Sequence, residues 1–370
     1  MQTDRRNWLK QSAFLLASLG VNSETFATTG NFSRPNEGKI LLNSNENAYG
    51  PSPMARKAIL EHYLQSNRYP DEMIEVLQKK IAVHTQVRPE NVLLGAGSSE
   101  IIGLALSLSN RGTRHYLVAE PAYSVWQSQA QALGYQSTRV ALNRERKYDL
   151  QKLAEQSKKS PPSFIYICNP NNPTGTFVDP DAIKKFVETV SSDHIVFIDE
   201  AYTEYAGLTS LGIYAIGKPN VIVARTFSKI YGLAGARIGY AIANTDAINK
   251  MAGLQPWPEA NLSAASVAAA TAALDDQDFV NDCKQKNIQA REICYDAFKR
   301  LELDYIPGSA NFILFNIDKI NGDLTGQMNA RNIYVQHREH FGGRWCRVTM
   351  GTTDEMKMFV KALEEIKNAK

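Results

Sequence analysis

A lysine in a partly apolar, glycine-rich stretch is the first residue whose setting points to chemistry. Lys229 lies in TFSKIYGLAGARIG, residues 226–239, after a β-like run and a Thr-x-Ser turn, and Arg237 follows it. A lysine amine in such surroundings has a lowered pKa and can form an imine with a carbonyl compound. Taken alone, the fragment also fits an ordinary surface lysine, so other residues must decide.

Polar side chains follow three further β-like runs. HIVFIDEAY supplies Asp199 and Tyr202, FIYICNPNNPTG supplies Asn172, and NVLLGAGSSE places a glycine-rich turn before Ser98 and Ser99. In open α/β sheets, ligands bind at the carboxyl ends of strands. An imine-forming lysine, a carboxylate, hydrogen-bond donors and an anion-binding helix N-terminus are the set that pyridoxal phosphate requires. The sequence therefore predicts a site for this cofactor.

The elements that must position these side chains alternate along the chain past residue 40. We expect strands at residues 91–95, 115–120, 164–169, 194–200 and 221–226. This pattern predicts a mainly parallel sheet covered by helices. Residues 263–303 predict successive long helices, and the β-like runs ANFILFNI and WCRVTMG then precede a terminal helix. The C-terminal part therefore indicates a second, smaller α/β domain.

Composition and charge narrow the function classes. A chain of 370 residues with 44% hydrophobic and 21% charged residues is long enough for a large core and two domains. The net charge of +3 comes from charges spread along the chain, so we expect no nucleic-acid partner. The four cysteines show no CxxC spacing, and we expect neither a metal site nor a disulfide framework.

The N-terminal segment has the layout of a secretory signal. Arg5 and Arg6 precede the apolar residues 12–21, and a stretch of small polar residues ends near Ala27. The apolar run is too short to span a bilayer, so we expect no stable membrane span. The arginine pair resembles a twin-arginine export signal over residues 1–27. We expect a periplasmic or secreted protein; the alternative is a cytoplasmic protein with a solvated N-terminal helix.

As a whole, the chain resembles the fold-type I pyridoxal-phosphate aminotransferases of class I/II, and most of all the histidinol-phosphate aminotransferase branch. The motifs that carry the resemblance are LNSNENAYGPSP, NRYPD, GAGSSE, EPAYS, NPNNPTG, DEAY, SKIYGLAGARIG and CRVTMGT. The resemblance implies an aspartate aminotransferase-like α/β fold, with a large domain around a mainly parallel central sheet and a smaller α/β domain. The implied boundaries are an arm with part of the small domain at 28–70, the large cofactor-binding domain at 71–283 and the small domain at 284–370.

The resemblance also implies roles for single residues. Lys229 forms the imine with the cofactor and later moves the substrate proton as a base. Asp199 pairs with the pyridinium nitrogen, and Tyr202 and Asn172 bond the ring's phenolic oxygen; Lys229, Asp199 and Tyr202 are the expected catalytic residues. Further expected cofactor-binding residues are Tyr123 on the ring face, and Ser98, Ser99, Thr226, Ser228 and Arg237 at the phosphate.

Tyr69, in NRYPD, matches a tyrosine that in this family reaches the phosphate from the neighbouring subunit. The resemblance thus implies a homodimer with a shared active site; core packing or a place in a turn is the alternative for Tyr69. Arg347 matches an arginine that binds the substrate α-carboxylate or contributes to a substrate phosphate. Asn311 and the segment around Asn45 and Asn47 are expected to line the same pocket.

Two departures from the family pattern concern the substrate. Gln336, in IYVQHREH, stands where the histidinol-phosphate branch has an arginine that helps to bind the substrate phosphate; His337, Arg338 or Arg344 are possible replacements. The second departure is QPWPEANLS, in which Trp257 is expected to reshape the pocket wall toward an aromatic or apolar side chain.

The resemblance predicts a ping-pong transaminase. It transfers an amino group between an amino acid or amine, with the aromatic or imidazole type favoured, and a 2-oxo acid. Two alternatives stay open at this point. One is a pyridoxal-phosphate-dependent decarboxylase similar to threonine-phosphate decarboxylase, and the other is a non-catalytic binding protein with the same fold.

Overall fold

We describe a computed structural model of the chain, and it describes residues 38–109, 112–257 and 262–369. The export signal expected at residues 1–27 therefore lies outside the described residues, as do residues 258–261 of the QPWPEANLS segment. The domain boundaries expected at 70/71 and 283/284 stay predictions.

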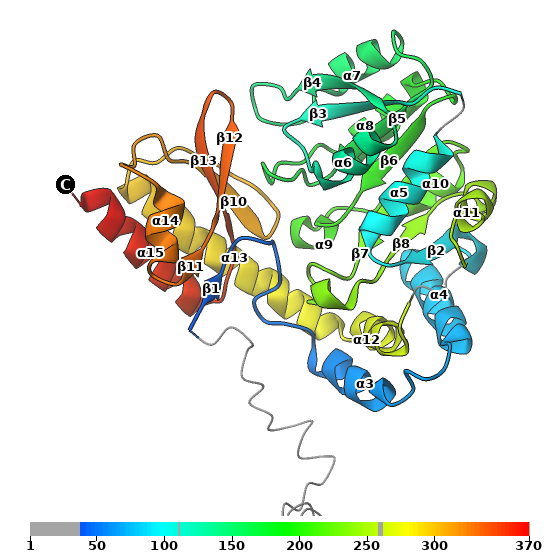
Figure 1. The fold of residues 1–370 in the computed structure, drawn as a ribbon, viewed down its shortest axis with the longest axis horizontal. Coiled ribbons are helices and arrows are strands. Elements are labelled where there is room, and N and C mark those ends of the chain that lie inside the picture. The colour runs from blue at the N-terminus through cyan, green and yellow to red at the C-terminus, as the bar shows by residue number, and fades with distance from the viewer. Residues whose placement is uncertain (1–37, 110–111, 258–261, 370) are drawn as a thin grey trace, which may run out of the picture. The chain divides into compact units, whose positions relative to one another are not determined.

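A seven-stranded sheet forms the larger part of the molecule (Figure 1). Its strands, in spatial order, are β2 (Val92–Gly95), β8 (Gly239–Ile242), β7 (Val221–Thr226), β6 (Ile195–Asp199), β5 (Phe164–Cys168), β3 (His115–Glu120) and β4 (Gln136–Ala141). Neighbouring strands from β7 to β4 are parallel, and β8 is antiparallel to both of its neighbours. The expected mainly parallel sheet is confirmed.

The helices from α3 to α12 belong to the same part of the molecule as this sheet. Their bounds are α3 (Pro53–Tyr63), α4 (Asp71–Thr85), α5 (Ser98–Leu108), α6 (Val125–Ala132), α7 (Leu150–Ser157), α8 (Pro180–Thr189), α9 (Thr203–Ala206), α10 (Gly212–Ile216), α11 (Thr245–Ala252) and α12 (Ala264–Asp275), with the 3-10 turns η1 (Pro89–Asn91) and η2 (Ala234–Ala236). Helix α5 contacts β6, β7 and β8, and α7 contacts β3 and β4. Every residue of β5, β6 and β7 is buried, which explains their nearly continuous apolar sequence.

A second, antiparallel sheet forms the smaller part of the molecule, on the left in Figure 1. It consists of β12 (Gln336–His340), β13 (Gly343–Thr349), β10 (Phe312–Asn316) and β9 (Tyr305–Ile306). The helices around it are α13 (Gln277–Arg300), α14 (Leu324–Asn329) and α15 (Thr353–Asn368), and they share a separate hydrophobic cluster with it. The long helices expected at 263–303, the two later strands and the terminal helix are all present.

The run IYVQHREH, residues 333–340, divides between two pairings. Its first part is β11 (Ile333–Tyr334), which pairs in parallel with β1 (Ile40–Leu41) near the start of the described chain. Its second part is β12, which pairs with β13. In the segment that follows β1, the carbonyl of Asn43 accepts a hydrogen bond from Arg347 of β13, and the carbonyl of Ser44 accepts one from Lys229, which follows β7.

Within the described residues, no helix is long and apolar enough to cross a membrane. The same residues contain no group of three or more His, Cys, Asp or Glu that could hold a metal ion. Cys168, Cys283, Cys294 and Cys346 are all buried free thiols.

Candidate active site

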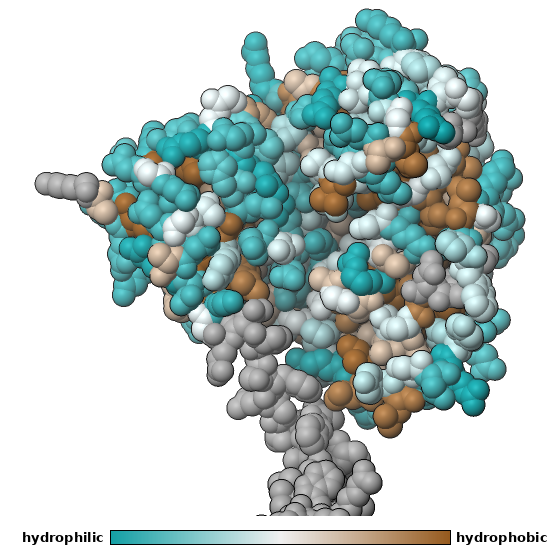
Figure 2. All heavy atoms as spheres, in the orientation of Figure 1, coloured by the Kyte–Doolittle hydropathy of each residue, from teal (hydrophilic) through white to brown (hydrophobic). Residues whose placement is uncertain are grey.

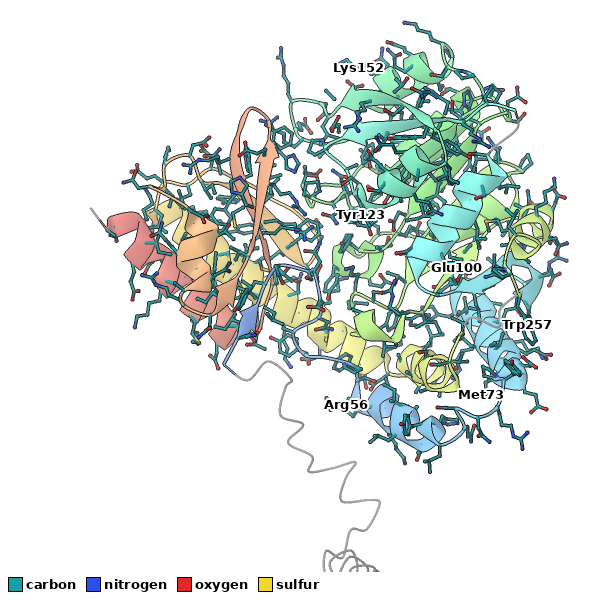
Figure 3. The ribbon with its side chains drawn as sticks, viewed as in Figure 1. Arg56, Met73, Glu100, Tyr123, Lys152 and Trp257 are labelled. Carbon is teal, nitrogen blue, oxygen red and sulfur yellow. The ribbon has the colours of Figure 1, made fainter. Side chains whose placement is uncertain are left out.

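A cavity of about 580 Å³ lies where the strands β5, β6 and β7 end and the small sheet begins. Residues from the β1–α3 segment, the N-terminus of α5, three strand ends, and β12 and β13 line it. The lining includes the following expected residues: Ser98, Ser99, Tyr123, Asn172, Asp199, Tyr202, Thr226, Ser228, Lys229, Arg237 and Arg347. In Figure 3, the labelled Tyr123 lies at the side of the large sheet that faces the small one.

Lys229 follows the last residue of β7 by three positions, so the strand end projects it into the cavity. Its Nζ is 3.5 Å from the carbonyl oxygen of Ser44 and 5.7 Å from the centre of the Tyr202 ring. Burial, reinforced by the positive charge of Arg347, lowers the pKa of the Lys229 amine to about 8, and Asp199 opposes this shift. The amine is thereby prepared for nucleophilic attack on a carbonyl near neutral pH.

Asp199 is the last residue of β6 and is 3% exposed. The Tyr166 hydroxyl donates to its Oδ2 at 2.7 Å, and the Ala201 N–H donates to its Oδ1 at 3.1 Å. Burial raises the pKa of the Asp199 carboxyl, while these two donors and the charge of Lys229 act in the opposite direction. A cationic group placed against this carboxylate offsets the cost of burying its charge.

A hydrogen-bond network connects the large sheet to the small one beside Lys229. The Tyr202 hydroxyl accepts from Asn45 Nδ2 at 3.0 Å and from Asn172 Nδ2 at 3.3 Å. Arg347 donates from Nη1 to Asn172 Oδ1 and from Nη2 to the carbonyl of Asn43, both at 2.8 Å. Burial lowers the pKa of Arg347 to about 10, which still leaves the guanidinium charged at neutral pH.

Groups suited to an anion gather around the start of α5. The helix begins at Ser98, and its N-cap residue Gly97 offers no side chain, so the first N–H groups of the helix are open to a ligand. A Cβ atom at Gly97 would lie 2.6 Å from Nη2 of Arg237. Across the site, the Thr226 hydroxyl donates to the Ser228 hydroxyl at 2.9 Å.

These residues fit pyridoxal phosphate, the cofactor that the sequence resemblance implies. Asp199 is a buried carboxylate that would accept from a protonated ring nitrogen, and Lys229 is an amine with a lowered pKa in the same cavity. Ser98, Arg237 and Ser228 would hold the phosphate, because helix N–H groups, hydroxyls and a guanidinium favour that anion. Tyr123 and Tyr202 would meet the ring face and its oxygen.

Two expected pocket residues, Asn47 and Asn311, are not among the residues that line the cavity, and their role toward the substrate stays a prediction. Asn47 donates to the carbonyl of Ile230 at 2.7 Å and thereby supports the loop that carries Lys229. Asn311 donates to the carbonyl of Glu46 at 3.2 Å. The amide nitrogens of both residues thus donate to backbone carbonyls beside the cavity. Asn45, from the same segment as Asn47, does line the cavity.

The structure also corrects the place expected for Trp257. The residue is 55% exposed, its ring packs against that of Tyr69 with 4.9 Å between ring centres, and it is absent from the cavity lining. Figure 3 shows Trp257 well separated from Tyr123. Tyr69 is itself 67% exposed and lies outside the cavity of its own chain, and its role toward a neighbouring subunit stays a prediction.

Sequence reasoning missed the role of Tyr166. Asp199 lies opposite Cys168 in the register of β5 and β6, and Tyr166 precedes Cys168 by two residues. Side chains two apart on a strand face the same side, so strand alternation was a signal that could have found it. Ser44 and Asn43 were also missed, because their backbone carbonyls, rather than their side chains, contact Lys229 and Arg347.

Comparison with known proteins places these features in one family. The model of the family described as aminotransferase class I and II matches residues 37–363. A histidinol-phosphate aminotransferase from Moorella thermoacetica is 36% identical over 333 residues, covering 88% of this chain and 85% of the relative. One from Caldicellulosiruptor saccharolyticus is 34% identical over 331 residues, covering 88% and 91%.

A solved structure agrees. The histidinol-phosphate aminotransferase from Sinorhizobium meliloti in complex with pyridoxal-5'-phosphate superimposes with a TM-score of 0.82 at 25% identity, covering 94% of each chain. These relatives are named as aminotransferases, so the decarboxylase and the non-catalytic binding protein are not favoured. With the fold-type I architecture, the strand-end lysine and aspartate, and a family match over most of its length, the chain belongs to the class I and II aminotransferases.

Proposed function

We propose that this protein is a pyridoxal-phosphate-dependent aminotransferase that transfers an amino group from an amino acid or amine to a 2-oxo acid by a ping-pong reaction. One observation carries the proposal: the buried Asp199 ends β6, Lys229 with its lowered pKa follows the adjacent parallel strand β7, and both line one cavity. An imidazole or aromatic amine is the donor class we favour, because relatives of this chain are named for histidinol phosphate. Gln336 departs from their pattern, so the donor need not be histidinol phosphate itself.

Each residue has a part that follows from its position. Bound pyridoxal phosphate supplies an electron sink for the charge that develops at the substrate Cα. Lys229 Nζ accepts the proton that leaves this carbon and returns it, because its pKa of about 8 lets it exist in both protonation states near neutral pH. Arg347, already oriented by Asn172 and Asn43, binds the substrate carboxylate through its remaining donor capacity.

The proposal is tested with purified protein and pyridoxal phosphate. Wild type is expected to take up one cofactor per chain, with a visible absorbance band that the Lys229→Ala variant lacks. A panel of the common amino acids plus histidinol phosphate, each supplied without an acceptor, should convert the bound cofactor to its amino form. A folded wild-type protein that takes up no cofactor and transfers no amino group would refute the proposal. Carbon dioxide release without amino transfer would favour the decarboxylase.

We further propose that the enzyme is a homodimer in which Tyr69 serves the partner's site. The exposed positions on and just after α3 include Met54, Leu60, Tyr63 and Leu64, and Figure 2 shows apolar side chains gathered over this part of the surface. Large exposed apolar patches mark interaction sites. Tyr69 follows this segment and is too exposed to be a core aromatic of its own chain.

Export through the twin-arginine route is also our proposal, and its support is the order of basic, apolar and small polar residues in positions 1–27. This route is understood to carry folded proteins, which suits an enzyme that assembles around an intracellular cofactor. The paired substitutions Arg5→Lys and Arg6→Lys are expected to retain active enzyme in the cytoplasm. Fractionation that finds the variant and wild type in the same compartment would contradict the proposal.

A further inference from the structure

Tyr166, in the middle of β5, reaches the active site from outside the cavity. It is fully buried and is not among the residues that line the cavity. Asp199, which ends the neighbouring strand β6, does line it, and the Tyr166 hydroxyl donates to Asp199 Oδ2 at 2.7 Å. An influence of Tyr166 on a group bound in the cavity therefore passes through Asp199.

Two aromatic neighbours hold the ring of Tyr166 in place. It lies opposite Phe197 in the β5–β6 register and stacks on it, with 5.9 Å between ring centres. It also packs against the buried ring of Trp126 in α6, at 5.0 Å. A side chain that is locked by packing keeps its polar atom within a narrow range of positions. The core of the large sheet thus sets the direction in which the hydroxyl donates.

Both oxygens of the Asp199 carboxylate accept a hydrogen bond from the protein. Oδ2 accepts from Tyr166, and Oδ1 accepts from the Ala201 N–H at 3.1 Å. These two donors fix the plane of the carboxylate. A carboxylate has about four lone-pair sites, so the two bonds leave room for a further donor. Because Asp199 lines the cavity, that donor can belong to a group bound there.

A neutral donor has an advantage over a cation at this position. Burial raises the pKa of the Asp199 carboxyl, and the hydrogen bond from Tyr166 is the largest influence in the opposite direction. Burial and the charge of Asp199 raise the pKa of the Tyr166 hydroxyl well above its usual range, so it stays a donor at neutral pH. A guanidinium in its place would compensate the carboxylate charge. The phenol stabilises the anion and leaves its full charge facing the cavity.

The other ionisable groups near Asp199 do not replace this bond. The positive charge of Lys229 also lowers the pKa of Asp199, but this amine must become neutral before it attacks a carbonyl. The remaining groups are three phenols and a thiol whose pKa is raised by burial, so they are uncharged at neutral pH: Tyr123, Tyr148, Tyr202 and Cys168.

We propose that Tyr166 is a positioning residue of the cofactor site, which holds the Asp199 carboxylate in the orientation that accepts from the ring nitrogen of pyridoxal phosphate. It acts through Asp199 and is therefore not a catalytic residue. Its hydrogen bond favours the arrangement in which the carboxylate is the anion and the ring nitrogen carries the proton. The inference rests on the proposed function, because the electron sink that the cofactor supplies is strongest when the ring nitrogen is protonated.

The test measures how strongly each protein prefers pyridoxal phosphate over deazapyridoxal phosphate, as the ratio of the two dissociation constants. The deaza compound has the same aldehyde, phenol and phosphate, but a CH group replaces the ring nitrogen. Wild type is expected to prefer pyridoxal phosphate. Tyr166→Phe keeps the packed ring and removes the hydroxyl, and should reduce this preference about 10-fold, the lower end of the range for a hydrogen bond to a charged group.

Tyr116→Phe is the matched control. Tyr116 is also buried and packs edge-on against Trp126 at 5.0 Å, but its hydroxyl donates to Gln127. Its variant should retain the preference of wild type. When Asp199→Asn is already present, adding Tyr166→Phe should change the preference by less than about twofold, because the group through which Tyr166 acts has lost its charge.

Nitrogen NMR of the holoenzyme, loaded with cofactor that carries a ¹⁵N label in the ring, gives an independent readout. The chemical shift of this nitrogen reports whether it is protonated. The signal is expected to move toward the unprotonated value in Tyr166→Phe and to stay in place in Tyr116→Phe. Fluorotyrosine at position 166 keeps the shape of the ring and makes the hydroxyl a stronger donor, so the preference for pyridoxal phosphate should rise.

The outcomes separate this inference from the proposed function. Equal weakening of both compounds in Tyr166→Phe, with an unmoved ¹⁵N signal, would show a packing defect and overturn the positioning role. Wild type that binds both compounds equally also overturns it, while amino transfer by the same protein would leave the proposed function intact. A folded wild type that takes up neither compound and transfers no amino group refutes the function itself. If Tyr166→Phe does not fold, a fluorotyrosine protein whose preference fails to rise overturns the inference.

Discussion

Burial gives Lys229 the reactivity that an ordinary lysine lacks. A lysine in water has a pKa near 10.5, so its amine is almost fully protonated at neutral pH. In the cavity, the loss of water and the charge of Arg347 outweigh the attraction of Asp199 and lower this pKa to about 8. A fraction of the amine is therefore in the neutral, nucleophilic form near neutral pH.

Cofactor uptake should show this pKa directly. The rate at which cofactor-free protein combines with pyridoxal phosphate is expected to rise about tenfold per pH unit below pH 8 and to level off above it, because only the neutral amine attacks. Since the folded-state pKa is the lower one, this group also favours folding increasingly as the pH rises from about 8 to 10.5. Stopped-flow absorbance measures the rate, and Lys229→Met is the control. A midpoint near pH 10.5 would contradict the argument.

At the scale of elements, the start of α5 and the loop that carries Arg237 form one unit. Gly97 has a φ of +77°, and the absence of a side chain there leaves room for the guanidinium of Arg237. Glycine at position 97 thus allows both the positive φ of the backbone and the close approach of the Arg237 guanidinium. The arginine and the helix N-terminus converge on one anion only if both conditions hold.

Gly97→Ala should weaken the binding of pyridoxal phosphate by about 10- to 100-fold, which is the range for losing a hydrogen bond to a charged group. The added Cβ would displace the guanidinium of Arg237, from which it would be 2.6 Å away. Pyridoxal without its phosphate should bind both proteins equally in a fluorescence titration. Gly112→Ala is the matched control, because Gly112 also has a positive φ, of +89°, but no atom within 4 Å of the new Cβ. Equal loss in both variants would attribute the effect to backbone strain alone.

Strands that are buried on both faces were predictable from the sequence. Strands that are exposed, or that depend on partner strands far away in the sequence, were not. β5, β6 and β7 were expected within a residue of their observed ends, because two-sided burial produces continuous apolar runs. β4 was missed because it is an edge strand with mostly exposed side chains. β8 was missed because its four residues directly follow the Arg237 loop. The division of residues 333–340 into β11 and β12 was missed because it depends on two different partner strands, β1 and β13, which the local sequence pattern does not encode.

The site residues that lie at or just after the end of a strand, within a recognisable short motif, were predictable from the sequence. Asp199, Asn172 and Lys229 belong to this class. The contacts that join the two sheets were not predictable in the same way. Asn45 accepts from the Thr349 hydroxyl at 3.1 Å across 304 positions of sequence, and only the folded chain brings the two together.

At the scale of the whole molecule, the proposed dimer makes Tyr69 and Lys229 of different chains members of one active site. We predict that inactive Lys229→Ala and weakened Tyr69→Ala proteins regain activity when they are mixed and allowed to exchange subunits. Each mixed dimer then contains one site with both residues intact, so up to about half of the activity of a wild-type dimer returns per mixed dimer.

Light scattering gives the oligomeric state, and an activity assay after subunit exchange gives the recovery. If Tyr69 acted within its own chain, each site of the mixed dimer would retain one defect and the mixture would stay as inactive as its parts. A monomeric wild-type enzyme with full activity would contradict the dimer altogether.

The short pairing of β1 with β11 sets a limit on proteolytic processing. Ile40 and Leu41 lie against Ile333 and Tyr334, and the residues that follow immediately supply Asn43 and Ser44 to the cavity wall. Under the proposed export, a protease that removes residues 1–27 leaves ten residues, 28–37, ahead of the described chain. A cut after Leu41 removes a strand and frees the end of the segment that contacts Lys229 and Arg347. Any proteolysis that keeps this wall of the cavity intact must therefore leave the two-residue strand β1 in place.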